Sequence, residues 1–195
     1  MEKEVKNTAL LVMDVQTGTV DRLEKKDEYI GKVSTAVAAA HKNHIPVIYV
    51  VVGFRPGFPE VSASNKTFST MKESAAAALV DPRPVIEPAN DDVVVVKRRV
   101  SAFSGSDLEV LLRAWGIKHL VLTGISTSGV VLSTTREAAD KDYQLTILSD
   151  LCADLDAEVH AVLLEKVFPR QATVMTSEQW INTQEKEQHT SRRRL

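Results

Sequence analysis

Residues 8–14 read Thr-Ala-Leu-Leu-Val-Met-Asp, an uninterrupted apolar run that stops on a carboxylate. Two later stretches have the same character, because 93–97 reads Val-Val-Val-Val-Lys and 119–123 reads His-Leu-Val-Leu-Thr. Short continuous runs of Val, Ile and Leu are typical of parallel strands that helices cover on both faces. These stretches therefore predict an α/β fold built on a buried parallel sheet.

The rest of the chain alternates strand-like and helix-like segments. Strands are expected at 8–13, 46–52, 92–97, 118–123, 144–149 and 172–175. Helices are expected at 27–43, 106–115, 128–141, 156–167 and 177–182. This alternation is the pattern of a parallel sheet with helices on both faces. The proline- and glycine-rich stretch 53–90 interrupts it, and we expect a long loop there that carries a short helix.

Composition and charge limit the class of protein. The 195 residues fit one domain, which we place at 1–183, and a polar tail at 184–195 that is expected to be disordered. A net charge of −2 gives no reason to expect nucleic acid as a partner, and no apolar run approaches the roughly 18 residues of a membrane span. The single cysteine, Cys152, excludes an intrachain disulfide framework and fits a reducing compartment. We therefore expect a cytoplasmic protein without a membrane or nucleic-acid partner.

Charged residues stand where two predicted strands end. In an open α/β sheet, ligands bind at the carboxyl ends of the strands. Burial would raise the pKa of Asp14 and a nearby cation would lower it, and either change suits a carboxyl group for proton transfer. Lys97 must reach solvent or find an anion, and Asp14 is the natural partner if their strands are neighbours. Position alone is equally compatible with an acid that pins a loop, and it favours an ordinary strand-end lysine.

Other polar groups near these strand ends have two interpretations each. Gln16 can hydrogen-bond a substrate or brace its own loop. One of Arg98 and Arg99 is expected to face the site, where it would hold an anionic group. The turn at 124–129 has two glycines and three hydroxyl residues before a helix, so it can aim amides at a developing negative charge or simply connect strand to helix.

Cofactor motifs are missing from the sequence. The five histidines form no recognisable ligand set with Asp or Glu, so no metal site is predicted. The first strand is not followed by a Gly-x-Gly-x-x-Gly motif, and the chain has no Gly-Lys-Ser/Thr phosphate loop. We therefore expect no cofactor and a small-molecule substrate.

Three segments together resemble the isochorismatase-like hydrolases, a superfamily that also contains nicotinamidases and N-carbamoylsarcosine amidases. They are Leu-Val-Met-Asp-Val-Gln at 11–16, Lys-Arg-Arg-Val-Ser-Ala-Phe at 97–103 and Gly-Ile-Ser-Thr-Ser-Gly-Val-Val-Leu-Ser-Thr-Thr-Arg-Glu-Ala-Ala at 124–139. Their order and spacing fit the superfamily from about residue 7 to residue 182. The resemblance implies a three-layer, Rossmann-like α/β/α sandwich around a six-stranded parallel sheet. It also implies a homo-oligomer, either a dimer or a tetramer.

The resemblance further implies roles for individual residues. Asp14 and Lys97 match the catalytic aspartate and lysine of the superfamily. The peptide bond between Ile125 and Ser126 is expected to be cis. The backbone amides of Ser126 and Val130 match those that form the oxyanion hole in the amidase members.

Two features depart from the pattern of the superfamily. Most members have a nucleophilic cysteine where this chain has Val130, and Cys152 lies about one strand and one helix later, where a small packed side chain is expected. The Asp-x-His metal-binding pattern of nicotinamidases is also missing, since 51–56 reads Val-Val-Gly-Phe-Arg-Pro. A valine side chain cannot attack a carbonyl, so the acyl-enzyme route is closed unless another group takes over.

The isochorismatases proper also lack the cysteine, and they hydrolyse a vinyl ether, which requires a proton rather than a covalent nucleophile. We therefore predict acid-catalysed hydrolysis of a small anionic metabolite, such as a vinyl ether, with Asp14 as the acid. The candidate substrate contacts are Gln16, the pocket-wall residues Phe54, Phe58 and Phe103, and Arg98 or Arg99. Two alternatives stay open. One is an inactive or regulatory member that binds a small molecule, and the other is a hydrolase of C–N bonds with a nucleophile other than cysteine.

Overall fold

The computed structural model of the protein describes residues 7–192, with the backbone alone at 74–77 and 187–192. Its centre is a six-stranded parallel sheet with the strand order β3-β2-β1-β4-β5-β6. The strands are β1 (Thr8–Met13), β2 (Val47–Val52), β3 (Val93–Lys97), β4 (His119–Ile125), β5 (Gln144–Ala153) and β6 (Thr173–Met175). The six predicted strands and the α/β fold class are therefore confirmed.

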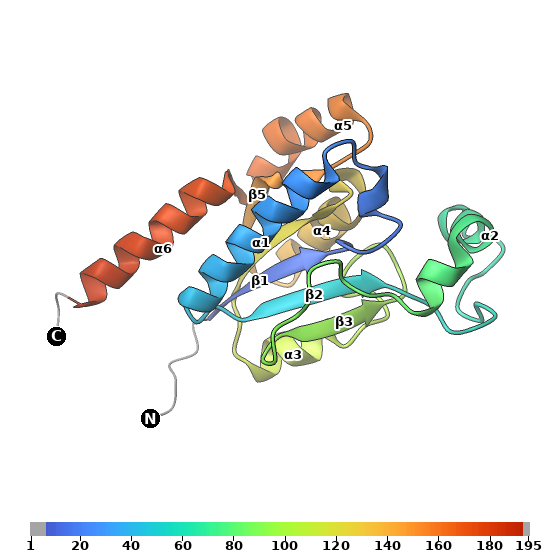
Figure 1. The fold of residues 1–195 in the computed structure, drawn as a ribbon, viewed down its shortest axis with the longest axis horizontal. Helices are drawn as coiled ribbons and strands as arrows, with labels where there is room; N and C mark the ends of the chain where they lie inside the picture. The colour runs from blue at the N-terminus through green and yellow to red at the C-terminus, as the bar shows by residue number, and fades with distance from the viewer. Residues whose placement is uncertain (1–6, 193–195) are drawn as a thin grey trace.

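Helices cover both faces of the sheet, which gives three layers (Figure 1). One face packs against α1 (Lys26–Lys42) and α6 (Ser177–Arg192). The other packs against α3 (Leu108–Ala114), α4 (Leu132–Asp140) and the segment that runs from α5 (Ala157–Val162) through η3 (Leu163–Val167) to η4 (Phe168–Arg170). In β1, Val12 packs toward α1, whereas its neighbours Leu11 and Met13 pack toward the opposite layer, because side chains alternate along a strand.

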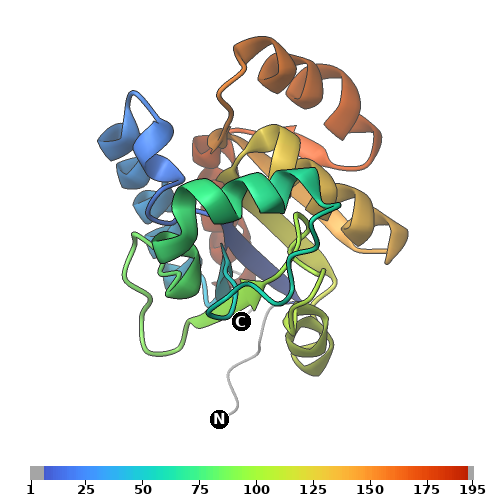
Figure 2. The same cartoon turned by 90° about the vertical axis from the view of Figure 1, so that its right-hand side faces the viewer.

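The stretch 53–90 contains more helix than predicted. Helix α2 (Lys66–Val80) is 15 residues long, and the side chain of its N-cap Asn65 accepts a hydrogen bond from the Phe68 amide. The prolines of this stretch stand before and after α2 rather than inside it, so they do not interrupt its hydrogen bonds. Figure 2 faces the carboxyl ends of the strands and shows α2, in green, lying across them. The stretch therefore covers the edge of the sheet where a ligand is expected.

The C-terminal helix is also longer than predicted. A helix was expected at 177–182 with disorder from 184, but α6 continues to Arg192. Trp180 is buried and packs the first part of α6 against the sheet. Further along the helix, Glu185 forms an ion pair with Lys42 of α1 at 3.2 Å. The Gln, Glu and Lys residues that follow favour helix, so nothing stops the helix there. Residues 193–195 lie outside the described residues. Neither α6 nor any other described helix is long and apolar enough to cross a membrane.

The close approach of β1 and β4 depends on Gly124. This residue has a φ of +153°. An added Cβ would overlap the carbonyl oxygen of Met13 and lie 3.0 Å from the Cβ of Met13. Gly31, on α1, is a natural comparison because an added Cβ there meets nothing within 4 Å.

We predict that Gly124→Ala lowers the free energy of unfolding by about 1–3 kcal/mol, because the backbone of β1 or β4 must shift to accept the methyl group. Gly31→Ala is expected to raise it by about 0.5–1 kcal/mol, because alanine favours a helix interior over glycine. Urea denaturation followed by circular dichroism measures both changes. Equal effects of the two substitutions would contradict the close approach at Gly124.

Candidate active site

Asp14 occupies a sharp turn directly after β1. Its amide donates a hydrogen bond to the carbonyl oxygen of Val50 at 2.7 Å, and its φ of +55° is a left-handed value that aspartate tolerates better than most residues. Asp14 is 8% exposed and lines a cavity at the carboxyl edge of the sheet. The turn therefore holds this carboxyl group at the edge that the sequence predicted to bind ligands.

Lys97 ends β3 and forms an ion pair with Asp14, with 3.0 Å between Nζ and Oδ2. Lys97 Nζ also donates to the carbonyl oxygens of Arg99 at 2.9 Å and Val100 at 3.0 Å. An ammonium group has three N–H donors, so these three acceptors saturate it. Lys97 is 2% exposed and therefore does not reach solvent as an ordinary strand-end lysine would.

The strands that carry Asp14 and Lys97 are not neighbours. The expectation that the two residues pair only if their strands are adjacent is therefore corrected. β2 lies between β1 and β3. Because strands stand about 4.8 Å apart, the two side chains must bridge about 10 Å. They do so where β2 ends at Val52, which is opposite Lys97 in the register. β1 and β4 are neighbours, and this brings Asp14 beside the turn that follows β4.

The two carboxyl groups that line the cavity have pKa values shifted in opposite directions. Burial raises the pKa of Asp14 and outweighs the attraction of Lys97, which lowers it. Asp14 Oδ1 is buried and has no hydrogen-bond partner among the described residues. At Asp154 burial also acts to raise the pKa, but hydrogen bonds outweigh it and lower the pKa. The Ser128 side chain contributes the largest part of this lowering, and the Ser128 amide, which donates to Asp154 at 2.7 Å, comes next. The cavity thus holds one carboxyl group that favours a proton and one that favours a negative charge.

The turn after β4 lies beside the ion pair. The peptide bond between Ile125 and Ser126 is cis, as the resemblance implied. The π-helical turn η2 (Thr127–Val131) follows and leads into α4. An added Cβ at Gly129 would lie 2.7 Å from Ser126 Oγ, so a glycine at this position leaves room for the serine side chain. Ser126 and Val130 both line the cavity.

Val130 and Cys152 lie in different surroundings. Val130 is 2% exposed and forms part of the cavity wall. Cys152 is on β5 opposite Gly124, belongs to the hydrophobic core and does not line the cavity. Burial raises the pKa of its thiol to about 12. Cys152 is therefore the packed side chain that the sequence predicted.

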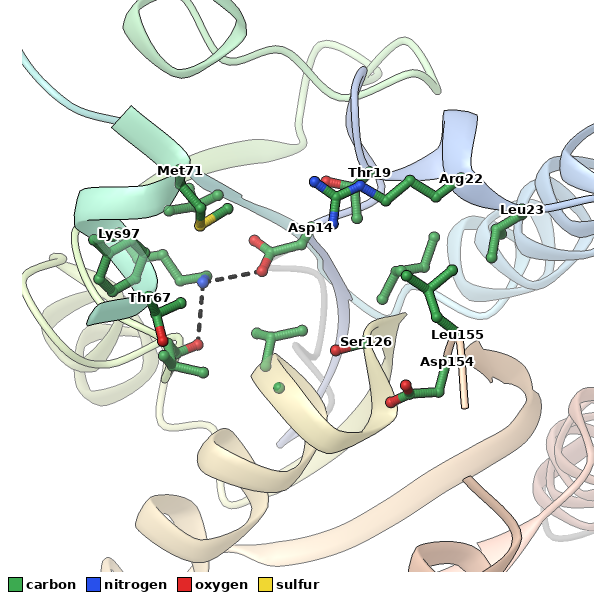
Figure 3. A pocket seen from close by; sticks show the side chains of 16 residues that line it. Asp14, Thr19, Arg22, Leu23, Thr67, Met71, Lys97, Ser126, Asp154 and Leu155 are labelled. Carbon is green, nitrogen blue, oxygen red and sulfur yellow. Dashed lines mark hydrogen bonds and ion pairs between the residues drawn. The ribbon is translucent and has the colours of Figure 1, made fainter. Parts of the chain in front are cut away.

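The cavity has a volume of about 220 Å³ and brings together four of the predicted site residues, Asp14, Lys97, Ser126 and Val130 (Figure 3). Helix α2 closes one side of it with Phe68 and Met71. Among the described residues, no group of three or more His, Cys, Asp or Glu side chains is arranged to hold a metal ion.

Gln16 does not line the cavity. Its Oε1 accepts a hydrogen bond from the Val52 amide at 2.8 Å, and its Nε2 donates to the Val52 carbonyl oxygen at 3.1 Å. Both ends of the side-chain amide are therefore occupied by the last residue of β2. This geometry favours the bracing interpretation of Gln16 over the expected substrate contact.

The predicted aromatic wall is also placed differently. Phe54 and Phe58 pack behind the cavity, and the ring of Phe54 lies 5.3 Å from that of Phe68, which forms the wall instead. Phe103 packs against Tyr143, away from the cavity. The expected wall residues follow β2 (Phe54 and Phe58) and β3 (Phe103), whereas the observed aromatic wall residue, Phe68, comes from α2.

Neither predicted arginine contact lines the cavity. Arg98 donates to the carbonyl oxygen of Gly53 at 2.8 Å, and Arg99 donates to that of Glu60 at 2.9 Å. Both guanidinium groups therefore bind the loop after β2 rather than the cavity, and the expectation that one of them holds an anionic group there is corrected.

Several lining residues escaped the sequence analysis because they come from η1 (Val20–Arg22), α2 and the end of β5. They are Thr19, Arg22, Leu23, Thr67, Phe68, Met71, Asp154 and Leu155. A signal existed for Asp154, because it directly follows β5 as Asp14 follows β1. It was missed because β5 was expected to end at residue 149 but runs to Ala153.

Residues 8–179 match the family model of the isochorismatase domain. The chain belongs to the isochorismatase family. It is 32% identical to the uncharacterized isochorismatase family protein YecD of Escherichia coli O157:H7, over 93% of this chain and 98% of YecD. It is 30% identical to a probable inactive nicotinamidase of Arabidopsis thaliana, over 82% of this chain and 87% of that protein. The solved N-carbamoylsarcosine amidase from Thermoplasma acidophilum is 25% identical, with a TM-score of 0.67 over 87% of this chain and 96% of the amidase.

Members of this family are generally hydrolases. The relatives above are named for an amidase reaction, for an inactive enzyme or for no reaction. Family membership therefore leaves the reaction to be argued from the residues of this cavity.

We predict opposite pH dependences for Asp14→Asn and Asp154→Asn. Between the ordinary value of 3.8 and the raised folded-state pKa of Asp14, the folded protein binds more protons than the unfolded chain, so wild-type stability falls as pH rises. Asp14→Asn removes this loss, and its stability relative to wild type is expected to rise with pH in that window. Asp154 has a lowered pKa, so its stabilisation is lost as pH falls below 3.8. Asp154→Asn is therefore expected to lose stability relative to wild type as pH rises toward 3.8.

Urea denaturation at a series of pH values from about 3 to about 7 measures these differences. Asp91→Asn is the control, because Asp91 is exposed and does not line the cavity. If the stability of both variants relative to wild type changed with pH in the same direction, the opposite pKa shifts of Asp14 and Asp154 would be contradicted.

Proposed function

We propose that this protein is a hydrolase of the isochorismatase type that cleaves a small anionic substrate, such as a vinyl ether, by acid catalysis without a covalent intermediate. One observation carries the proposal. The buried carboxyl group of Asp14, held by Lys97, faces a cavity that Val130 also lines, and the resemblance matches Val130 to the nucleophile of the superfamily. The site therefore offers a proton donor and lacks a side chain at that position that can attack a carbonyl.

In the proposed reaction, protonated Asp14 donates its proton to the terminal carbon of the C=C bond. The electron pair of that bond forms the new C–H bond, and the ether oxygen stabilises the resulting oxocarbenium ion. Water adds to the charged carbon and returns a proton to Asp14. The hemiketal then breaks its C–O bond as its hydroxyl proton passes to the leaving oxygen. The net reaction consumes one water and releases an alcohol and a ketone.

Lys97 stabilises the carboxylate that Asp14 becomes after proton transfer. Its Nζ is already 3.0 Å from Asp14 Oδ2 and is fixed by two backbone carbonyl groups. Stabilisation of a developing charge by a group that is already in place needs no reorganisation during the reaction. Burial raises the pKa of Asp14, so a protonated fraction persists at a higher pH than for an exposed carboxyl group.

A hydrolase of C–N bonds is the second candidate, because the hydroxyl group of Ser126 lines the cavity (Figure 3). Such a reaction requires a base that activates the hydroxyl. Within the described part of the chain, no side chain forms a hydrogen bond with Ser126 Oγ. The second candidate therefore has weaker support than proton transfer from Asp14.

Asp14→Asn is expected to lower kcat/KM for isochorismate by at least about 100-fold, because a side-chain amide cannot donate the required proton. Pyruvate release, coupled to lactate dehydrogenase, measures the rate. Asp91→Asn is the matched control and is expected to keep the wild-type rate, since Asp91 is exposed outside the cavity. No turnover by the wild type, or undiminished turnover by Asp14→Asn, would overturn the proposal. Hydrolysis of an amide by the wild type but not by Ser126→Ala would favour the second candidate.

Iodoacetamide is expected to leave wild-type activity largely intact. Cys152 is buried, and a pKa of about 12 keeps its thiol protonated and unreactive. Val130→Cys places a thiol in the cavity wall and serves as the matched reactive variant. Its new thiol is expected to react with Ellman's reagent at least about tenfold faster than Cys152. Full inactivation of the wild type through modification of Cys152 would show that this thiol takes part in the reaction.

A further inference from the structure

An anionic substrate needs a cation in the cavity, and only two cationic side chains line it, as far as the described residues show. These are Lys97 and Arg22. All three N–H donors of the Lys97 ammonium group already have acceptors, which are Asp14 and two backbone carbonyl groups. Arg98 and Arg99, which follow Lys97, bind backbone carbonyl groups outside the cavity. This elimination leaves Arg22 to bind a negative charge.

Arg22 is the last residue of η1, and its side chain extends over the cavity toward Asp14 (Figure 3). No hydrogen bond or ion pair to its guanidinium group is formed by the side chains and backbone that the structure describes. A guanidinium group carries five N–H donors and binds a carboxylate through two parallel hydrogen bonds. Its donors are therefore available to a ligand.

The backbone that carries Arg22 is firmly held. The Val20 amide donates to the carbonyl oxygen of Gln16 at 3.2 Å, and the Leu23 amide donates to that of Val20 at 3.0 Å. Val20 is buried, and Gln16 is itself fixed to the end of β2. The backbone position of Arg22 is thus fixed relative to the ion pair, while its guanidinium group is available to bind a ligand.

We propose that Arg22 determines specificity by binding a carboxylate group of the substrate. This inference rests on the proposed function, in which the substrate is a small anion. Asp154 also lines the cavity, next to Ser126 and away from Lys97 (Figure 3), and it repels a negative charge. The substrate carboxylate is therefore directed to Arg22 and away from Asp154, and the reacting bond is left over Asp14.

The test measures binding without turnover, with benzoate as the carboxylate probe and benzamide as its neutral analogue of similar shape. Arg22→Gln is expected to weaken benzoate binding by about 10- to 100-fold in isothermal titration calorimetry and to leave benzamide binding unchanged. Arg22→Lys keeps the charge but loses the planar fork, so an intermediate loss is expected. Arg170→Gln is the matched control, because Arg170 is exposed and does not line the cavity.

Three results would overturn the inference. One is wild-type protein that binds benzoate no better than benzamide. Another is an equal loss of benzoate and benzamide binding in Arg22→Gln, which indicates a structural role. The third is an equal loss of benzoate binding in Arg22→Gln and Arg170→Gln, which indicates net charge alone. Benzoate binding that depends on Arg22 in a protein without vinyl ether hydrolysis supports this inference and refutes the proposed function, so the two failures are distinguishable.

Discussion

The buried ion pair between Asp14 and Lys97 is the constraint on which the rest of the site depends. Charges removed from water are costly unless they are paired and hydrogen-bonded. Lys97 meets this condition through three acceptors, whereas Asp14 leaves Oδ1 without a partner among the described residues. The cost of desolvation therefore falls on the carboxyl group, which a proton relieves. This difference in hydrogen bonding between Lys97 and Asp14 suits an acid that loses and regains a proton better than it suits a purely structural salt bridge.

The pair forms across the end of β2, which lies between β1 and β3. The Gln16 side chain forms hydrogen bonds with both the backbone amide and the carbonyl oxygen of Val52. Only a side chain with both an acceptor and a donor can do this. Gly53 follows, and its amide donates to the carbonyl oxygen of Lys97 at 3.2 Å. A Cβ at Gly53 would overlap the ring of Pro82. These contacts thus fix the end of β2, across which Lys97 reaches Asp14.

The strands and their charged ends could be predicted from the sequence because each depends on a local apolar run. Asp14 and Lys97 are the first charged residues after such runs, and the sheet fixes where they lie. The direction of Arg98 could not be predicted, because it depends on how the chain turns after β3 to reach the carbonyl oxygen of Gly53. Arg22 lies in a three-residue turn that is too short for any periodic pattern. Its turn is hydrogen-bonded to Gln16, whose side chain binds the distant end of β2.

In the proposed chemistry, Val130 matters for what it does not add to the cavity. A thiolate at this position would add a further anion to the cavity and compete with Asp14 for the charge of Lys97. With a valine at this position, no thiolate competes with Asp14 for the ion pair with Lys97. Together with Phe68 and Met71 the valine also gives the cavity an apolar wall, which strengthens electrostatic effects and maintains the raised pKa of Asp14. In the proposed reaction, Val130 therefore supplies no nucleophile and also favours proton transfer, so both properties of this side chain fit the same chemistry.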